Sequence, residues 1–196
     1  MVIHAHNLSK SYNKMSLFKD ISFDINEGDR AVIRAASGCG KTTLLNILAG
    51  IIKPDEGYIS LDEKPISDFL AYRREVASYV PCGNVLLDSM PVFENVQLVS
   101  KDEDNIKQIL RDLNVWHIRK SYPKNISSGE YKRVCIARAI ASDTPFIFLD
   151  EPTSNLDDKN AMIVFNYLST LKQGLVIATH DPRIAFDNEK KIYLRE

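Results

Sequence analysis

The sequence is short of cysteine and of long hydrophobic runs, and each shortage excludes a class of protein. Its 196 residues hold three cysteines, Cys39, Cys82 and Cys135, which lie far apart and form no C-x-x-C pair. Neither a disulfide framework nor a zinc site is therefore expected, and a reducing compartment fits. No apolar run approaches the ~20 residues that span a bilayer, and the N-terminus lacks the charged-then-apolar pattern of a signal peptide. We expect a chain that does not cross a membrane by itself.

An excess of charge of either sign is also missing. Lys and Arg number 25 against 26 Asp and Glu, a formal net charge of −1, with 44% hydrophobic and 26% charged residues. Nucleic acid is not expected as a partner, because a domain that binds it normally shows a basic face and a high pI. The composition is that of an ordinary globular domain, which excludes disordered and collagen-like structure.

Short runs rich in Val, Ile and Phe alternate with helical patterns along the chain. We predict strands at 22–25, 31–35, 58–61, 77–80, 146–149 and 175–179, the last three buried on both faces. We predict helices at 42–49, 102–113, 130–141 and 161–171. Strands that alternate with helices indicate an α/β fold with a mostly parallel sheet.

A phosphate-binding loop is predicted directly after the strand at 31–35. A loop with little side-chain bulk lets backbone N–H groups surround a phosphate chain at a helix N-terminus. In such a loop the lysine neutralises the β and γ phosphates and the next hydroxyl holds Mg²⁺. The strict pattern G-x-x-x-x-G-K-[ST] fails at Ala35, so a turn that merely contains Gly-Cys-Gly-Lys is the plain alternative. The residues predicted to bind nucleotide here are Ser37, Gly38, Cys39, Gly40, Lys41, Thr42 and Thr43.

Further motifs follow in a fixed order along the chain. Tyr12 ends Lys-Ser-Tyr, Ile126–Glu130 reads Ile-Ser-Ser-Gly-Glu, Asp150-Glu151 follows an apolar run, Ser154–Asp157 reads Ser-Asn-Leu-Asp, and His180 ends Ala-Thr-His. Together with the phosphate loop, they resemble the nucleotide-binding domain of an ATP-binding cassette (ABC) transporter over nearly the whole chain. The signature motif of that family is written loosely as L-S-G-G-Q/E.

The resemblance implies a catalytic and a metal set. Thr42 and Asp150 would hold Mg²⁺, Glu151 would polarise the attacking water, and Lys41 and His180 would act on the γ-phosphate. A carboxylate at the end of a buried strand can reach the phosphate loop, because ligands of doubly wound folds bind outside those strand ends. The plain alternatives are a solvated helix start for the Asp-Glu pair and a strand-end histidine with an ordinary hydrogen bond.

The resemblance also implies a second nucleotide-binding surface. Tyr12 would pack against adenine, while Ser127, Ser128 and Gly129 would face the γ-phosphate held by the other subunit, with Asp157 in the adjacent D-loop. Their amides would form an anion site at a helix N-terminus. The plain alternatives are core packing for Tyr12 and a simple helix cap for the serines.

From the resemblance we expect one ABC ATPase domain over 1–196, an α/β P-loop NTPase fold with an antiparallel β part near the N-terminus. Its core would comprise 1–94 and 126–196, and 95–125, which has helix but no clear strand, would be a helical subdomain. The expected function is ATP hydrolysis between two head-to-tail domains with Mg²⁺, driving a transmembrane permease subunit from the cytoplasmic face of the membrane. The finer likeness is to exporters of lipoproteins, macrolides and antimicrobial peptides.

Three positions depart from the family pattern. Ala35 replaces the first glycine of the phosphate loop, Ser128 replaces the first glycine of the signature, and Cys82 stands at the Q-loop glutamine. A thiol is a poor magnesium ligand, so the metal is expected to depend on Thr42 and Asp150. These departures leave open a regulatory subunit with weak or no hydrolysis. A small P-loop kinase is a further alternative, but it predicts an arginine-rich lid that is not evident.

Overall fold

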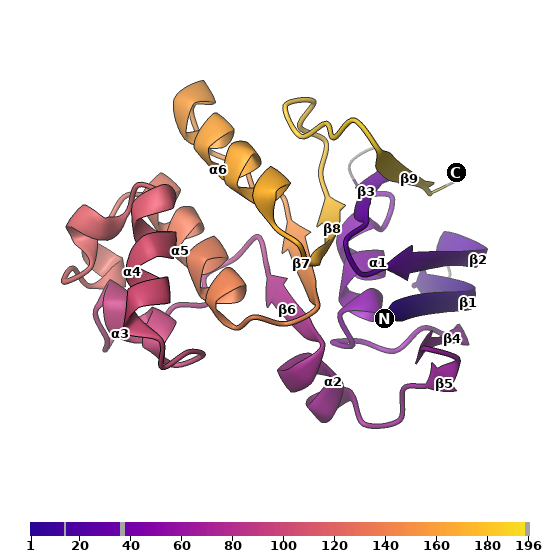
Figure 1. Cartoon of the computed structure of the whole chain (residues 1–196). Coiled ribbons are helices and arrows are strands. Elements are labelled where there is room, and N and C mark those ends of the chain that lie inside the picture. The colour runs from indigo at the N-terminus through magenta and orange to yellow at the C-terminus, as the bar shows by residue number, and fades with distance from the viewer. Residues whose placement is uncertain (14, 36–37, 195–196) are drawn as a thin grey trace.

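Two β-sheets form the centre of the structure, a computed structural model that describes residues 1–13, 15–35 and 38–194 (Figure 1). The antiparallel sheet has the order β2-β1-β4-β5 and consists of β1 (Val2–Tyr12), β2 (Met15–Asn26), β4 (Glu56–Leu61) and β5 (Lys64–Pro65). The parallel sheet has the order β6-β7-β8-β3-β9 and consists of β3 (Arg30–Arg34), β6 (Ala77–Val80), β7 (Phe146–Asp150), β8 (Gly174–Ala178) and β9 (Glu189–Tyr193). The predicted α/β fold is confirmed.

The α-helices of the described residues are α1 (Lys41–Leu48), α2 (Phe69–Glu75), α3 (Val92–Gln97), α4 (Glu103–Asp112), α5 (Ser128–Ala141) and α6 (Asp158–Thr170). Four of them, α1, α4, α5 and α6, lie where the sequence predicted helices. Two short 3-10 helices, η1 (Trp116–Ile118) and η2 (Pro123–Asn125), follow α4. The predicted helices at 130–141 and 161–171 begin earlier than expected, because Ser127 and Asp157 cap α5 and α6 with their side chains.

Several elements were not predicted from the sequence. They are β1, β5, β9, α2 and α3. The helices α2 and α3 have only seven and six residues, too few to show a helical period. In β1 buried residues alternate with polar ones that are only partly covered, so the strand has no continuous apolar run.

The prediction that three strands are buried on both faces is wrong for β6. Every residue of β7 and β8 is buried, whereas Ser78 and Tyr79 of β6 are only half-buried. The reason is topological, because β6 is an edge strand of the parallel sheet and β7 and β8 lie inside it.

Helices α3, α4 and α5 pack together at one side of the parallel sheet, away from the antiparallel sheet (Figure 1). Asp102 caps α4 by accepting a hydrogen bond from the backbone N–H of Asn105. Ile106, Ile109 and Leu110 of α4 are buried in the same apolar cluster as α5 and β7. Within residues 92–125 the structure contains only helices and turns. No helix of the described ranges is long and apolar enough to cross a membrane.

The carboxyl ends of three neighbouring strands define where a ligand can bind. Asp150 of β7 pairs with Ala178 of β8, which in turn pairs with Ile33 of β3. The loop after β3, the residues after β7 and the residues after β8 therefore meet at one edge of the sheet. In open α/β sheets this edge is the usual place for a ligand.

Candidate functional site

The loop between β3 and α1 has the backbone geometry of a phosphate cradle. Gly38 and Gly40 both have φ near +85°, a conformation that a side chain disfavours. A Cβ on Gly40 would lie 3.1 Å from the Cβ of Leu17. Gly40 is the N-cap of α1 and offers no side-chain cap, so the first N–H groups of the helix can bind an anion.

The loop and the first turn of α1 also contain Ala35, Cys39 and Thr43. The φ of Ala35 is not positive, so alanine fits where the family pattern has glycine. Ser37 lies outside the described residues. Cys39 is half-buried and Thr43 lies in the first turn of α1.

Lys41 and Thr42 carry the side chains that face the strand ends. The buried Lys41 donates from Nζ to the carbonyl oxygen of Ala35 at 2.9 Å. The Thr42 hydroxyl donates to both carboxylate oxygens of Asp150, at 3.1 and 3.0 Å. The first turn of α1 is thereby joined to the end of β7, which brings a hydroxyl and a carboxylate oxygen together.

Asp150 is 3% exposed, and its charge is balanced by several neighbours. Burial raises the pKa of this carboxyl above its ordinary value, and the repulsion from Glu151 acts in the same direction. The hydrogen bond from Thr42 and the positive charges of Lys132 and Lys41 oppose that rise. A cation or a proton would satisfy this carboxylate.

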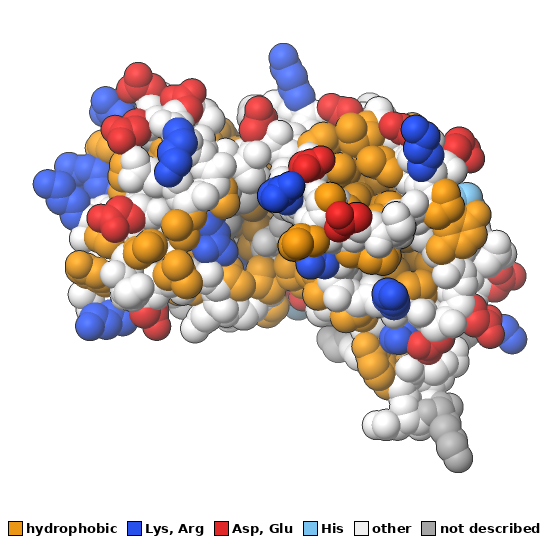
Figure 2. All heavy atoms as spheres, turned by 90° about the horizontal axis from the view of Figure 1, so that it is seen from below, with side chains coloured by type: hydrophobic (Ala, Val, Ile, Leu, Met, Phe, Trp, Pro, Cys, Tyr) orange, Lys and Arg blue, Asp and Glu red, His pale blue; other side chains and the backbone are white. Residues whose placement is uncertain are grey.

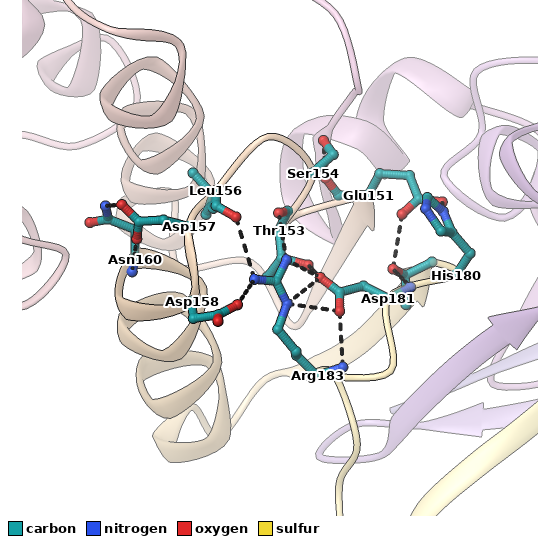
Figure 3. Close-up of polar contacts among 11 residues, drawn as sticks. Glu151, Thr153, Ser154, Leu156, Asp157, Asp158, Asn160, His180, Asp181 and Arg183 are labelled. Carbon is teal, nitrogen blue, oxygen red and sulfur yellow. Dashed lines mark hydrogen bonds and ion pairs between the residues drawn. The ribbon is translucent and has the colours of Figure 1, made fainter.

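Glu151 has a strained backbone and a fixed side chain. Its φ is 47°, unusual for a residue with a side chain, and its N–H donates to the carbonyl oxygen of Ala178 at 2.8 Å. One carboxylate oxygen accepts from the Thr179 hydroxyl at 2.9 Å, and the other lies 2.7 Å from Nδ1 of His180 (Figure 3). The His180 side chain is 70% exposed. A carboxylate held by two neighbours and placed beside an exposed imidazole suits the activation of a water molecule.

An ion-pair network that the sequence did not predict holds the segment after Glu151. Arg183 donates to both carboxylate oxygens of Asp181 and, at 2.8 Å, to Asp158 at the start of α6 (Figure 3). The Thr153 hydroxyl also donates to Asp181, at 2.6 Å. The hydrogen bonds from Arg183 hold the pKa of Asp181 well below its ordinary value. The signal in the sequence for this network is that Asp181 and Arg183 lie close to His180.

The predicted signature motif forms a capping box at the start of α5. Ser127 donates from its backbone N–H to Glu130 at 2.9 Å, and the Glu130 N–H donates to the Ser127 hydroxyl at 3.3 Å. The N–H of Ser127 is also the main cause that lowers the pKa of Glu130. The helix cap proposed as the plain alternative is therefore present, and the first amides of α5 have no acceptor within the helix.

A cavity of about 570 Å³ opens beside this cap. Its lining includes the buried Arg133, 4% exposed, whose Nε has no hydrogen-bond partner among the described residues. Asp157, which caps α6, also lines it, and the N–H of Asn160 lowers the pKa of this carboxyl. We call Ser127, Ser128, Gly129 and Asp157 the signature face and Lys41, Thr42, Asp150, Glu151 and His180 the phosphate-loop cluster. In the described part of the chain no hydrogen bond joins the two groups.

Tyr12 lies at the end of β1, and its side chain is 50% exposed. The core-packing interpretation of this residue is therefore wrong. The Lys10 ammonium lies 5.4 Å from the centre of its ring. Tyr12 pairs with Met15 across the hairpin, and a cavity of about 540 Å³ lies there, lined by Met15, Ser16, Leu17, Phe18, Lys19, Gly38 and Cys39. The stretch 15–19 is the part of this cavity that the sequence did not indicate.

These features together define the class of the protein. A glycine-containing loop opens a helix at the carboxyl edge of a parallel sheet, and a buried carboxylate contacts the hydroxyl of that helix. The fold and the site are those of a P-loop protein that binds a nucleoside triphosphate.

Comparison with known proteins agrees with the assignment to the P-loop class. Residues 18–154 match the profile of the ABC transporter family. The chain is 31% identical to the lipoprotein-releasing system ATP-binding protein LolD of Cytophaga hutchinsonii, over 100% of this chain and 97% of that protein. It is 32% identical to the bacitracin export ATP-binding protein BceA of Halalkalibacterium halodurans, over 100% of this chain and 85% of that protein. A solved dimeric ATP-binding cassette with bound ADP and Pi superposes with a TM-score of 0.89 at 28% identity, covering 98% of this chain and 94% of that one.

The chain therefore belongs to the ABC transporter family, as one of its ATP-binding, transport-coupled ATPase domains. Its relatives over the full length include ATP-binding proteins of export systems.

Proposed function

We propose that this chain binds ATP with Mg²⁺ in the phosphate-loop cluster and hydrolyses it there. The observation that carries the proposal is the contact of Thr42 with both oxygens of the buried Asp150. It places a hydroxyl and a carboxylate, the oxygen ligands that Mg²⁺ prefers, beside the helix N-terminus that would hold the phosphates. The bound metal would neutralise charge on the β and γ phosphates.

The remaining groups of the cluster have distinct roles in the proposed hydrolysis. Lys41 binds the β and γ phosphates, and its position is fixed by its hydrogen bond to Ala35. Glu151 accepts a hydrogen bond from the attacking water and orients it toward the γ-phosphate. His180, in contact with Glu151 at 2.7 Å, holds that carboxylate and reaches the γ-phosphate with its exposed ring.

The rest of the nucleotide extends from the loop toward the first hairpin. The amides of residues 38–40 and the first turn of α1, including Thr43, surround the α and β phosphates. The cavity beside Gly38 and Cys39 then receives the ribose and the base. Tyr12, exposed at the neighbouring end of β1, packs on the adenine.

A second copy or a related domain completes the site from the other side. The signature face lies on an open cavity with a buried arginine at the N-terminus of α5, an arrangement that suits the γ-phosphate of a partner's ATP. The dimeric state of the related cassette supports this geometry. ATP would hold the two domains head to tail, and hydrolysis would release them.

The partner that uses this cycle is a transmembrane permease subunit, and the chain works on the cytoplasmic face of the membrane. We assign residues 1–94 and 126–196 to the ATPase core and 95–125 to a helical subdomain. Figure 2 views the molecule from below, where hydrophobic side chains lie among charges of both signs. Leu87, Leu98 and Val99 are exposed on the face around α3. A permease segment docks on this face. Export is the direction favoured by the full-length relatives.

The alternative of a regulatory subunit with weak hydrolysis has no observation in its favour. Ala35 is accommodated without a positive φ, and Glu151 and His180 contact each other directly. Cys82 is exposed and does not interrupt the contact of Thr42 with Asp150.

Phosphate release by the purified chain tests the proposed function. We expect turnover that requires Mg²⁺ and is abolished in Lys41→Ala, since the loss of a phosphate-binding cation removes transition-state stabilisation. Lys53→Ala, which removes an exposed lysine elsewhere, serves as the matched control and keeps wild-type turnover. Turnover that persists in Lys41→Ala, or does not need Mg²⁺, would overturn the proposal.

A further inference from the structure

A buried lysine outside the phosphate loop lies close to the proposed metal site. Lys132 belongs to α5 and is 7% exposed. Its ammonium donates to the carbonyl oxygen of Pro81 at 3.2 Å. An ammonium group has three N–H donors, and among the described residues this carbonyl is the only hydrogen-bond partner of the Lys132 ammonium. Burying such a cation is unfavourable unless further partners compensate for the lost water.

The position of Pro81 locates the Lys132 ammonium in the fold. Pro81 follows β6, whose last residue, Val80, pairs in register with Leu149 of β7. Asp150 is the next residue after Leu149, so the Lys132 ammonium lies above the ends of the same two strands.

The space around Lys132 is open toward the strand ends. A cavity of about 480 Å³ is lined by Lys132, Cys82, Ser128, Tyr131 and Ser154, among others. Cys82 is exposed there, and its short thiol occupies the position at which the family pattern has a longer glutamine. The ammonium thus borders an open space beside the residues that follow β6 and β7, and the side chain at position 82 does not fill it.

We propose that Lys132 is a second phosphate-directed cation of the nucleotide site, contributed by α5, which assists Mg²⁺ in balancing the charge of the triphosphate and Asp150. This proposal rests on the proposed function, because it needs ATP in the phosphate-loop cluster. It assigns to Lys132 a role that the thiol of Cys82 cannot perform. It also explains why a lysine is tolerated in a buried place with one carbonyl as partner.

The proposal predicts two effects of opposite sign. Loss of the Lys132 charge weakens ATP binding in the absence of metal, because an attraction to the phosphates is removed. The same loss strengthens the apparent affinity for Mg²⁺ at saturating ATP, because a cation near the metal no longer repels it. A merely structural role for Lys132 would weaken both affinities together.

The experiment compares the wild-type chain with Lys132→Gln, Lys132→Arg and Lys124→Gln. Lys124 lines the same cavity but is exposed, so its replacement makes the same change of net charge. ATP affinity is measured by equilibrium dialysis in EDTA, and the Mg²⁺ concentration for half-maximal phosphate release is measured at saturating ATP.

In Lys132→Gln we expect roughly tenfold weaker ATP binding in EDTA and a roughly threefold lower half-maximal Mg²⁺ concentration. Lys132→Arg and Lys124→Gln should remain near wild type in both measurements. Unchanged values in Lys132→Gln would overturn the proposal, and so would losses of both affinities that Lys132→Arg shares. If the wild-type chain neither binds nor hydrolyses ATP, the proposed function fails instead, independently of Lys132.

Discussion

The phosphate-loop cluster and the signature face are built from the same chain but differ in how far that chain completes them. In the cluster, side chains from different loops contact one another, as Thr42 contacts Asp150 and His180 contacts Glu151. On the signature face, Ser127 and Asp157 cap their own helices by accepting hydrogen bonds from the N–H groups of Glu130 and Asn160. The cluster is therefore preorganised within one chain, whereas the first amides of α5 on the face have no acceptor within their own helix.

The physical origin of this difference is the parallel sheet. Parallel strands bring their carboxyl ends to one edge, so loops that are distant in sequence meet there and satisfy one another. A helix N-terminus at the surface is satisfied locally by its cap, and its remaining donors need a ligand or a partner. We therefore expect that one chain can bind ATP, whereas turnover needs a second domain.

Replacing Glu151, the proposed water-polarising group, should have the largest effect on turnover at the phosphate-loop cluster. In Glu151→Gln we expect turnover to fall roughly 10²–10⁴-fold while ATP binding is kept, because the amide no longer accepts the proton of the attacking water. Phosphate release and equilibrium dialysis measure the two quantities. Glu75→Gln, a change in an exposed surface pair of α2, is the control, and equal losses in both variants would contradict the assignment.

The network around Arg183 connects the two regions, and its contribution to stability depends on pH. Asp181→Asn should lower the free energy of unfolding at pH 7 by about 2 kcal/mol, since hydrogen bonds to a buried carboxylate are lost. The folded-state pKa of Asp181 is depressed. Its stabilising effect is thus fully present above the ordinary carboxylate pKa of about 4 and declines as the pH falls through the folded value.

Urea denaturation at pH 7 and pH 3 measures this effect. The difference between wild type and Asp181→Asn should be smaller at pH 3, because the unfolded carboxylate is then largely protonated. A difference that is constant or grows toward acid pH would show that the ion pair of Asp181 with Arg183 does not stabilise the fold.

The signature face is tested by comparing two helix caps. Ser127→Ala and Asp102→Ala each remove an N-cap side chain and should each destabilise the chain by about 1 kcal/mol. Only Ser127→Ala should weaken ATP-dependent dimerisation, measured by size-exclusion chromatography in a Glu151→Gln background. If both variants dimerise equally well, Ser127 is only a cap and the second region has no role in nucleotide binding.

The smallest expected effects are differences in the alkylation rates of the three cysteines. Cys82 is exposed and should be alkylated at a rate that ATP does not change. Cys135 is 4% exposed and burial raises its pKa to about 11, so it should react only on unfolding. Cys39, in the phosphate loop, should be protected by ATP, as mass spectrometry of modified peptides would show. An unprotected Cys39 would argue against a nucleotide in this loop.

Much of the fold was predictable because local patterns determine it. The apolar runs at 146–149 and 175–179 indicated the central strands, and the apolar spacing of Ile106, Ile109 and Leu110 indicated α4. The edge position of β6 was not predictable, because strand order depends on contacts between distant segments. The short α2 and α3 were missed because their few residues carry no period.

The sequence by itself determined the order of the motifs, the type of the fold and the chemistry of each side chain, since these depend on neighbouring residues along the chain. The tertiary structure decided which side chains meet. It joined Thr42 to Asp150 and His180 to Glu151, placed Arg183 between Asp158 and Asp181, and brought the buried Lys132 above the strand ends. The physical reason is that hydrogen bonds and charge interactions act over a few ångströms in space, whereas most of these partners lie tens of residues apart in sequence.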